Sequence, residues 1–159
     1  MSSCLPVLYI CYARFSTVKL ALSNLLSINS INIYISFNRY TGSDPTLLNN
    51  NSLILQYIEI LKSTYPSLIS DIQYKSSLET ASSSILSAID WFFGKVSFGV
   101  IVEEDCLIDH RFFPYASSAL LYYDNHPHVA AITSNLFFPA SRRSSSSLVF
   151  SRVPLIWGW

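Results

Sequence analysis

Residues 99–106, Gly-Val-Ile-Val-Glu-Glu-Asp-Cys, place an apolar run directly before three consecutive carboxylates. Such a run is typical of a strand that is buried on both faces, as in a parallel sheet. Open α/β sheets bind their ligands outside the carboxyl ends of such strands. Three adjacent carboxylates at that position indicate a site for a divalent cation that carries a phosphorylated substrate. The alternative is a solvated turn, the more common origin of an acidic triplet when nothing else is known.

Segments with strand character and segments with helix character alternate along the chain. We expect strands at 5–13, 31–37, 70–74, 99–102 and 129–133, and helices from about 14–17 to 26, at 53–65, at 78–93 and at 112–123. Ser16 or Thr17 is the expected N-cap of the first helix, Gly94 closes the third, and 38–51 is expected to be a polar loop. This alternation predicts β-α-β crossovers, and therefore an α/β fold with a mostly parallel sheet flanked by helices.

Composition excludes several classes of protein. The formal net charge is zero, and Arg142-Arg143 is the only basic cluster, so we do not expect a nucleic-acid partner. The apolar runs are shorter than the roughly 20 residues that a bilayer span needs, and no secretory signal is expected. Three cysteines without C-x-x-C spacing fit reduced thiols better than disulfides or a zinc site. Together these features predict a cytoplasmic protein.

The C-terminal segment departs from the alternating pattern. Residues 141–147 hold two arginines and five serines, which predicts a loop that cannot order itself alone. The chain then ends on Trp157-Gly158-Trp159. Indole rings usually pack against structure that follows, so we expect a C-terminally truncated product.

The order of these motifs resembles the nucleotide-diphospho-sugar transferases of the GT-A type, in particular the small haemolysin-like HlpA group, which is related to the N-acetylglucosaminyltransferase I type. The resemblance spans nearly the whole chain. It is carried by Pro6–Ile10 with Arg14 soon after, Ile33–Ser36, Ser87–Phe93, Gly99–Leu107 with Phe112–Pro114, and Trp157–Trp159. It implies a Rossmann-like nucleotide-sugar-binding domain over residues 1–140. Residues 141–159 would then be a loop and the start of an acceptor-side region.

This chain departs from the family pattern at several positions. The family has Glu-Asp-Asp where this chain has Glu103-Glu104-Asp105, so the middle carboxylate is one methylene longer. The family's Asn-Arg after the first strand is Ala13-Arg14, and its Asp-Gly after the second strand is Asn38-Arg39. Its Asn-Leu-Gly before the long helix is Ser77-Leu78-Glu79. The last acidic residue, which holds the metal in such enzymes, is retained as Asp105.

The resemblance implies roles for four residues. Sugar transfer from a nucleotide-diphospho-sugar needs Mn²⁺ or Mg²⁺, which take oxygen ligands and stabilise the charge on the departing diphosphate. Asp105 would bind the metal, and Glu104 would assist directly or through water. Glu103 would orient the ribose or support another ligand, and Arg14 would contact the nucleotide or its phosphates. No residue can be assigned as the catalytic base.

Arg14 and several further candidate residues also have a simpler interpretation. Arg14 could equally be the partner of a surface ion pair. His110, His126 and His128 are expected to be solvated rather than metal ligands, and Trp91-Phe92-Phe93 is expected to pack in the core at a helix end.

Three functions remain open at this stage. The first is a metal-dependent glycosyltransferase domain that uses a UDP- or GDP-sugar and an unknown glycan or other acceptor, for polysaccharide or glycoconjugate synthesis. The second is a truncated, non-catalytic GT-A-like remnant with weak or no nucleotide binding. The third is an α/β protein without a nucleotide role.

Overall fold

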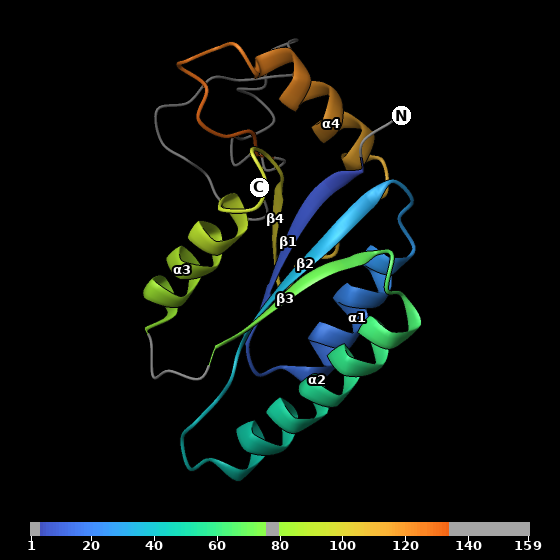
Figure 1. The fold of residues 1–159 in the computed structure, drawn as a ribbon. Coiled ribbons are helices and arrows are strands. Elements are labelled where there is room, and N and C mark those ends of the chain that lie inside the picture. The colour runs from blue at the N-terminus through green and yellow to red at the C-terminus, as the bar shows by residue number, and fades with distance from the viewer. Residues whose placement is uncertain (1–3, 76–79, 134–159) are drawn as a thin grey trace, which may run out of the picture.

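The computed structural model describes residues 4–75 and 80–133, and it shows the expected alternation of strands and helices (Figure 1). The elements are β1 (Leu5–Cys11), α1 (Phe15–Leu26), β2 (Ile31–Asn38), α2 (Pro45–Thr64), β3 (Ile69–Lys75), α3 (Ala81–Phe93), β4 (Val100–Glu103) and α4 (Phe112–Tyr123). The fold class predicted from the sequence, α/β, is confirmed.

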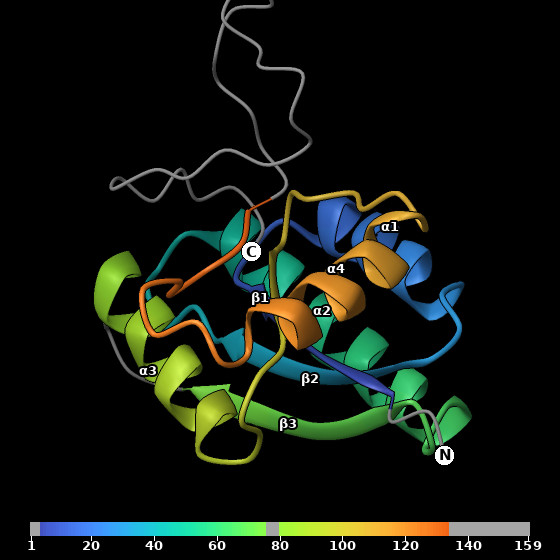
Figure 2. The same cartoon turned by 90° about the horizontal axis from the view of Figure 1, so that it is seen from above.

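The strands form one parallel sheet in the order β3-β2-β1-β4. The chain adds β2 and then β3 on one side of β1, and it then returns to add β4 on the other side of β1. Because β-α-β crossovers are right-handed, this reversal puts the last crossover helix on the opposite face of the sheet. Accordingly, α1 and α2 lie side by side on one face and α3 lies on the other (Figures 1 and 2).

Each face of the sheet has its own apolar core, because side chains alternate between the two faces along every strand. Val7 and Tyr9 of β1 point towards α1 and α2, and Phe113 of α4 joins the same cluster. Leu8 and Ile10 point the other way, towards α3. Phe92 fills this second core and is fully buried, as expected for the Trp91–Phe93 segment, although Phe93 itself is exposed.

The structure corrects one expected helix start and one expected N-cap. The polar segment 38–51 is not a loop throughout, since α2 already begins at Pro45. Asp44 caps it by accepting hydrogen bonds from the backbone N–H groups of Thr46 and Leu47, and proline at the first helical position suits a helix start. Helix α1 begins at Phe15, so neither Ser16 nor Thr17 is its N-cap. The link from β1 is short, so the helix begins before Ser16 and Thr17. Arg14 occupies the N-cap position without a side-chain capping hydrogen bond.

The predicted strand at 129–133 was wrong. These residues follow α4 without regular structure, because they pair with none of the strands that the structure describes. The predicted helix at 112–123 and the Gly94 helix end are confirmed. The expected loop at 141–147 and Trp157–Trp159 lie outside the described residues. Within 4–75 and 80–133, no helix combines the length and the apolar character needed to cross a bilayer.

Candidate functional site

The acidic triplet opens into a pocket at the carboxyl edge of the sheet. β4 ends at Glu103, beside the end of β1, which is the point where the strand order reverses direction. Open α/β sheets bind ligands at this switch point. The pocket has a volume of about 290 Å³, close to the lower size of small-molecule sites. Its lining comes from the ends of three strands, from the β1–α1 link and from α3: Ile10, Cys11, Tyr12, Arg14, Asn38, Ala81, Ser84, Ile85, Glu103, Glu104 and Asp105.

Strand register explains why these residues share one side of the sheet. Ile10 pairs with Glu103 on β4 and with Ser36 on β2. Asn38 lies two residues beyond Ser36, and a period of two returns it to the face that Ile10 and Glu103 occupy. This is the face covered by α3, so Ser84 of that helix closes the pocket from above the sheet.

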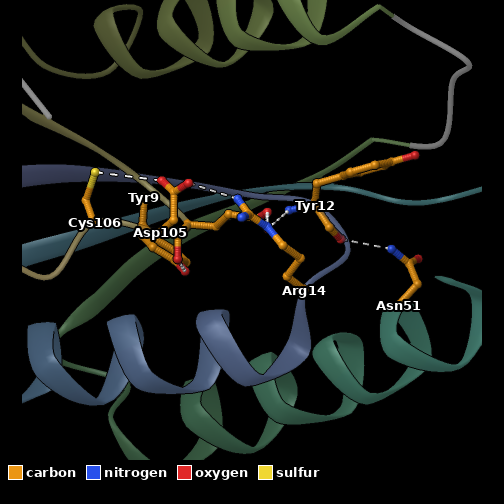
Figure 3. Close-up of polar contacts among 7 residues, drawn as sticks. Tyr9, Tyr12, Arg14, Asn51, Asp105 and Cys106 are labelled. Atoms are coloured by element: carbon orange, nitrogen blue, oxygen red, sulfur yellow. Dashed lines mark hydrogen bonds and ion pairs between the residues drawn. The ribbon is translucent and has the colours of Figure 1, made fainter. Parts of the chain in front are cut away.

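Arg14 binds two of the three carboxylates. Its Nε donates to Glu104 Oε1 at 2.5 Å, and its Nη2 donates to Asp105 Oδ2 at 3.1 Å. Figure 3 shows Arg14 reaching from the start of α1 to Asp105. Arg14 therefore forms an ion pair, one of the two interpretations left open by the sequence, and its partners line the same pocket.

Glu104 has hydrogen-bond partners on both carboxylate oxygens. Its Oε2 accepts from the backbone N–H of Tyr12 at 2.9 Å, while Oε1 is held by Arg14. Asn51 of α2 secures the same loop, since its Nδ2 donates to the Tyr12 carbonyl at 3.1 Å (Figure 3). The Glu104 side chain is 12% exposed, against 41% for Asp105. Glu104 is thus a mostly buried connection between the end of β4 and the β1–α1 link.

The carboxylates on the acidic side of the pocket repel one another. Partial burial raises the pKa of Glu103 above its ordinary value, and the adjacent charges of Asp105 and Glu104 raise it further. The hydrogen bonds to Glu104 and Asp105 raise the Arg14 pKa in turn. Burial raises the pKa of Tyr9, which lies below the triplet, so its phenol stays neutral. One cation faces three carboxylates among the residues that line the pocket, which leaves the site net negative.

Asn38, which the sequence marked only as a departure from the family's Asp-Gly, lines the pocket. Its side-chain Oδ1 is buried and has no hydrogen-bond partner within the described part of the chain. A buried acceptor without a donor costs about 1–3 kcal/mol, so such groups are usually satisfied by a ligand or an ordered water. The period-two series Tyr34, Ser36, Asn38 was the signal that could have placed it on the pocket face.

Whether a divalent cation fits this pocket depends on the ligands that the described side chains offer. They contain no group of three or more His, Cys, Asp or Glu side chains placed to hold a metal ion. Mg²⁺-like ions on phosphate substrates, however, often use only one or two carboxylates, with phosphate and water completing the shell. Asp105 fits that arrangement: it is partly exposed, and its Oδ1 faces the Cys106 thiol at 3.9 Å, a weak contact. Glu104, with both oxygens engaged, fits less well as a direct ligand.

The three histidines lie away from this pocket. His110 is exposed and its Nδ1 lies 3.5 Å from Asp109 Oδ1. His126 stacks on Tyr122 in the turn after α4, with ring centroids 5.6 Å apart. None of the three, His128 included, belongs to the described pocket lining.

Comparison with known proteins gives a likeness in structure. No protein-family model and no curated protein sequence matches the chain. Among solved structures, the chain resembles the mannosyltransferase PcManGT from Pyrobaculum calidifontis, which was determined in complex with GDP-mannose and Mn²⁺. The TM-score is 0.51 at 13% sequence identity, and the alignment covers 74% of this chain. It covers 32% of the other chain, so this chain spans about a third of that protein's length.

The likeness shows the fold alone: a Rossmann-like α/β domain, whose described strands form an all-parallel sheet.

Proposed function

We propose that this chain is a metal-dependent glycosyltransferase domain that binds a nucleotide-diphospho-sugar at the carboxyl edge of its sheet. The observation that carries the proposal is the position of the acidic pocket at the β1–β4 switch point of a glycosyltransferase-like fold. Binding of GDP-mannose and Mn²⁺ by the structural neighbour supports a nucleotide sugar and a divalent cation as ligands. The GT-A type and the HlpA-like group remain part of the proposal, as do the division into 1–140 and 141–159 and a cytoplasmic location.

Asp105 is the residue proposed to hold Mn²⁺ or Mg²⁺. When bound, the cation supplies Lewis-acid stabilisation of the departing nucleoside diphosphate. Asp105 suits this role because its carboxylate is the exposed member of the pair that Arg14 binds. Glu104 supports Asp105 through its hydrogen bonds to Tyr12 and Arg14, which hold the β1–α1 link beside the end of β4. We do not propose Glu104 as a direct ligand of the metal.

Glu103, Arg14 and Asn38 are proposed to bind the nucleotide. Glu103 lies at the strand end, partly buried, where its carboxylate can accept hydrogen bonds from ribose hydroxyls. Arg14 can donate in a fork to phosphate oxygens, a geometry that guanidinium groups favour. Asn38 presents a buried acceptor with no donor among residues 4–75 and 80–133, which suits an N–H or O–H group of the donor substrate.

The test locates the ligands on the protein. Amide NMR spectra of the ¹⁵N-labelled chain are recorded with UDP or GDP, first with Mg²⁺ and then with trace Mn²⁺, which broadens nearby signals. We expect the strongest broadening at Asp105 and Cys106, with nucleotide shifts at Tyr12 and Asn38. Signals of Lys62 and Thr64, three or more helical turns beyond Asn51 in α2, serve as the distant reference. Broadening centred elsewhere, or no nucleotide shifts with either base, would refute the proposal.

A second function is favoured by one observation. Both oxygens of Glu104 are engaged, so the described part of the chain offers a single well-placed metal carboxylate. This fits a non-catalytic GT-A-like remnant that binds nucleotide weakly and transfers nothing. Hydrolysis of UDP- or GDP-sugars by the purified chain with Mn²⁺ distinguishes the two. Release of free sugar above the level of the Asp105→Ala variant supports the enzyme, and equal rates support the remnant.

A further inference from the structure

We propose that Arg14 is an exchangeable counter-ion of the acidic pocket, and that it couples the binding of the cation to the binding of the diphosphate. In the ligand-free protein its guanidinium neutralises Glu104 and Asp105. When a divalent cation and a diphosphate occupy the pocket, Arg14 gives up Asp105 and binds phosphate oxygens instead. The inference rests on the proposed function, since it concerns the same site.

The two contacts of Arg14 differ in how firmly they are held. The contact with Glu104 is short, and Glu104 is largely buried and fixed by the Tyr12 N–H group. The contact with Asp105 is longer, and both side chains are well exposed, 56% for Arg14 and 41% for Asp105. Ion pairs between exposed side chains contribute little to stability. The Asp105 contact is therefore the one that can be exchanged.

The backbone of Arg14 permits such an exchange without moving the helix. Its carbonyl accepts the backbone N–H of Val18 at 2.9 Å, which anchors the first turn of α1. Its side chain makes no capping hydrogen bond to that turn. The guanidinium can thus swing between Asp105 and a ligand in the pocket while α1 stays in place.

Charge explains why the exchange couples the two ligands. Arg14 is the one basic side chain among the residues that line the described pocket, and it competes with a divalent cation for Asp105. Bringing a second cation to Asp105 repels the guanidinium, and a diphosphate gives it new acceptors with suitable geometry. Each ligand therefore binds more tightly in the presence of the other, and by thermodynamic linkage the two effects are equal in size.

A static role for Arg14 makes a different prediction. If Arg14 only bound phosphate, its removal would weaken nucleotide binding and leave the affinity for the cation alone unchanged. If it only braced the loop, its removal would weaken both. Exchange predicts two changes together when Arg14 is neutral: the free cation binds more tightly, because Asp105 loses a competitor, and the coupling between cation and nucleotide falls.

The experiment measures Mn²⁺ affinity by the electron paramagnetic resonance signal of free Mn²⁺, without nucleotide and with saturating GDP or UDP. For the wild type we expect coupling of at least about fivefold. In Arg14→Gln we expect Mn²⁺ alone to bind about two- to fivefold more tightly and the coupling to shrink by a similar factor. Arg111→Gln is the matched control, since Arg111 forms an exposed pair with Asp109 outside the pocket lining. It should change neither value.

Arg14→Lys keeps the charge and guards against a folding defect in Arg14→Gln. It should bind Mn²⁺ alone as the wild type does, but with reduced coupling, because an ammonium lacks the planar fork. Unchanged or weaker Mn²⁺ binding by a folded Arg14→Gln, or tighter binding by Arg14→Lys, would overturn the exchange while the proposed function stands. If the wild type fails to bind nucleotide when Mn²⁺ is present and also when Mg²⁺ is present, the proposed function fails, and the inference fails with it.

Discussion

The Nε atom of Arg14 lies 2.5 Å from Oε1 of Glu104, across 90 residues of sequence. This contact connects the β1–α1 link to the end of β4, two segments that meet only because the chain returns to the far side of β1. The shape of the acidic pocket is therefore set jointly by the first and last strands of the sheet.

Glu104 should matter for stability more than Asp105 does. We expect Glu104→Gln to lower the free energy of unfolding by about 1–2 kcal/mol, because it weakens charge-assisted hydrogen bonds to Arg14 and Tyr12. Asp105 binds the same guanidinium but is exposed, so Asp105→Asn should lower the free energy of unfolding by less than about 0.5 kcal/mol. Urea unfolding of both variants provides the comparison. Equal losses would mean that Glu104 is not the structural member of the pair.

Gly99 should tolerate no side chain. A Cβ atom there would lie 2.5 Å from Phe92 Cζ and 2.8 Å from the Pro6 carbonyl oxygen. We expect Gly99→Ala to destabilise the protein by about 1–3 kcal/mol, since β4 must shift against β1. Gly94→Ala is the control: its φ is −68° and the nearest atom to the new Cβ is 3.3 Å away. Its unfolding free energy should change by less than about 0.5 kcal/mol.

Asn38 and Asn51 should respond differently to the same substitution. Asn51 is buried and its side chain holds the Tyr12 carbonyl, so Asn51→Ala should cost about 1–2 kcal/mol. Asn38→Ala removes a buried oxygen that has no partner in the described structure, so it should cost distinctly less. It should nevertheless weaken nucleotide binding. Thermal unfolding with nucleotide titration measures both effects, and a greater loss of stability at Asn38 would count against a ligand-binding role for its Oδ1.

Asp71 should contribute stability that depends on pH. The hydrogen bond from Lys95, 2.9 Å away, holds the pKa of Asp71 below its ordinary value. A depressed folded-state pKa adds stability above the unfolded pKa of about 3.9, and that stability is lost as the pH falls through the folded value. Because both side chains are exposed, Asp71→Asn should cost only about 0.5 kcal/mol at pH 7.

The pH dependence of this pair is checked by a double-mutant cycle. Asp71→Asn, Lys95→Gln and the double variant are unfolded in urea at pH 7 and at the lowest pH where all remain folded. We expect the coupling energy to shrink at the acidic pH. A coupling that grows on acidification would reverse the sign assigned here.

Much of the fold could be predicted from local sequence. Apolar runs such as Leu5–Cys11 and Ile31–Asn38 are strands because both of their faces are buried in a parallel sheet. The start of α2 was missed because the asparagines at 49–51 suggested a loop, although Asp44-Pro45 is a helix-start signal. Only tertiary contact explains Asn51 inside the helix, since its side chain bonds to a distant carbonyl.

The candidate site was predictable in part. The triplet at a strand end and Arg14 after the first strand could be located from local pattern. That one guanidinium binds two of the carboxylates could not, since it depends on β4 lying beside β1. The burial of the Asn38 oxygen, which has no partner within the described segments, likewise depends on the strand order and on α3 covering that face.

The most direct test of metal-dependent nucleotide-sugar binding at Asp105 is a calorimetric titration. GDP-mannose and UDP-N-acetylglucosamine are titrated into the wild type and into Asp105→Ala, with Mn²⁺ and with EDTA. We predict that at least one donor binds the wild type with Mn²⁺, and that EDTA or Asp105→Ala weakens binding at least about tenfold, or 1.4 kcal/mol. Equal affinity in EDTA, or full Mn²⁺-dependent affinity in Asp105→Ala, would contradict the proposed site.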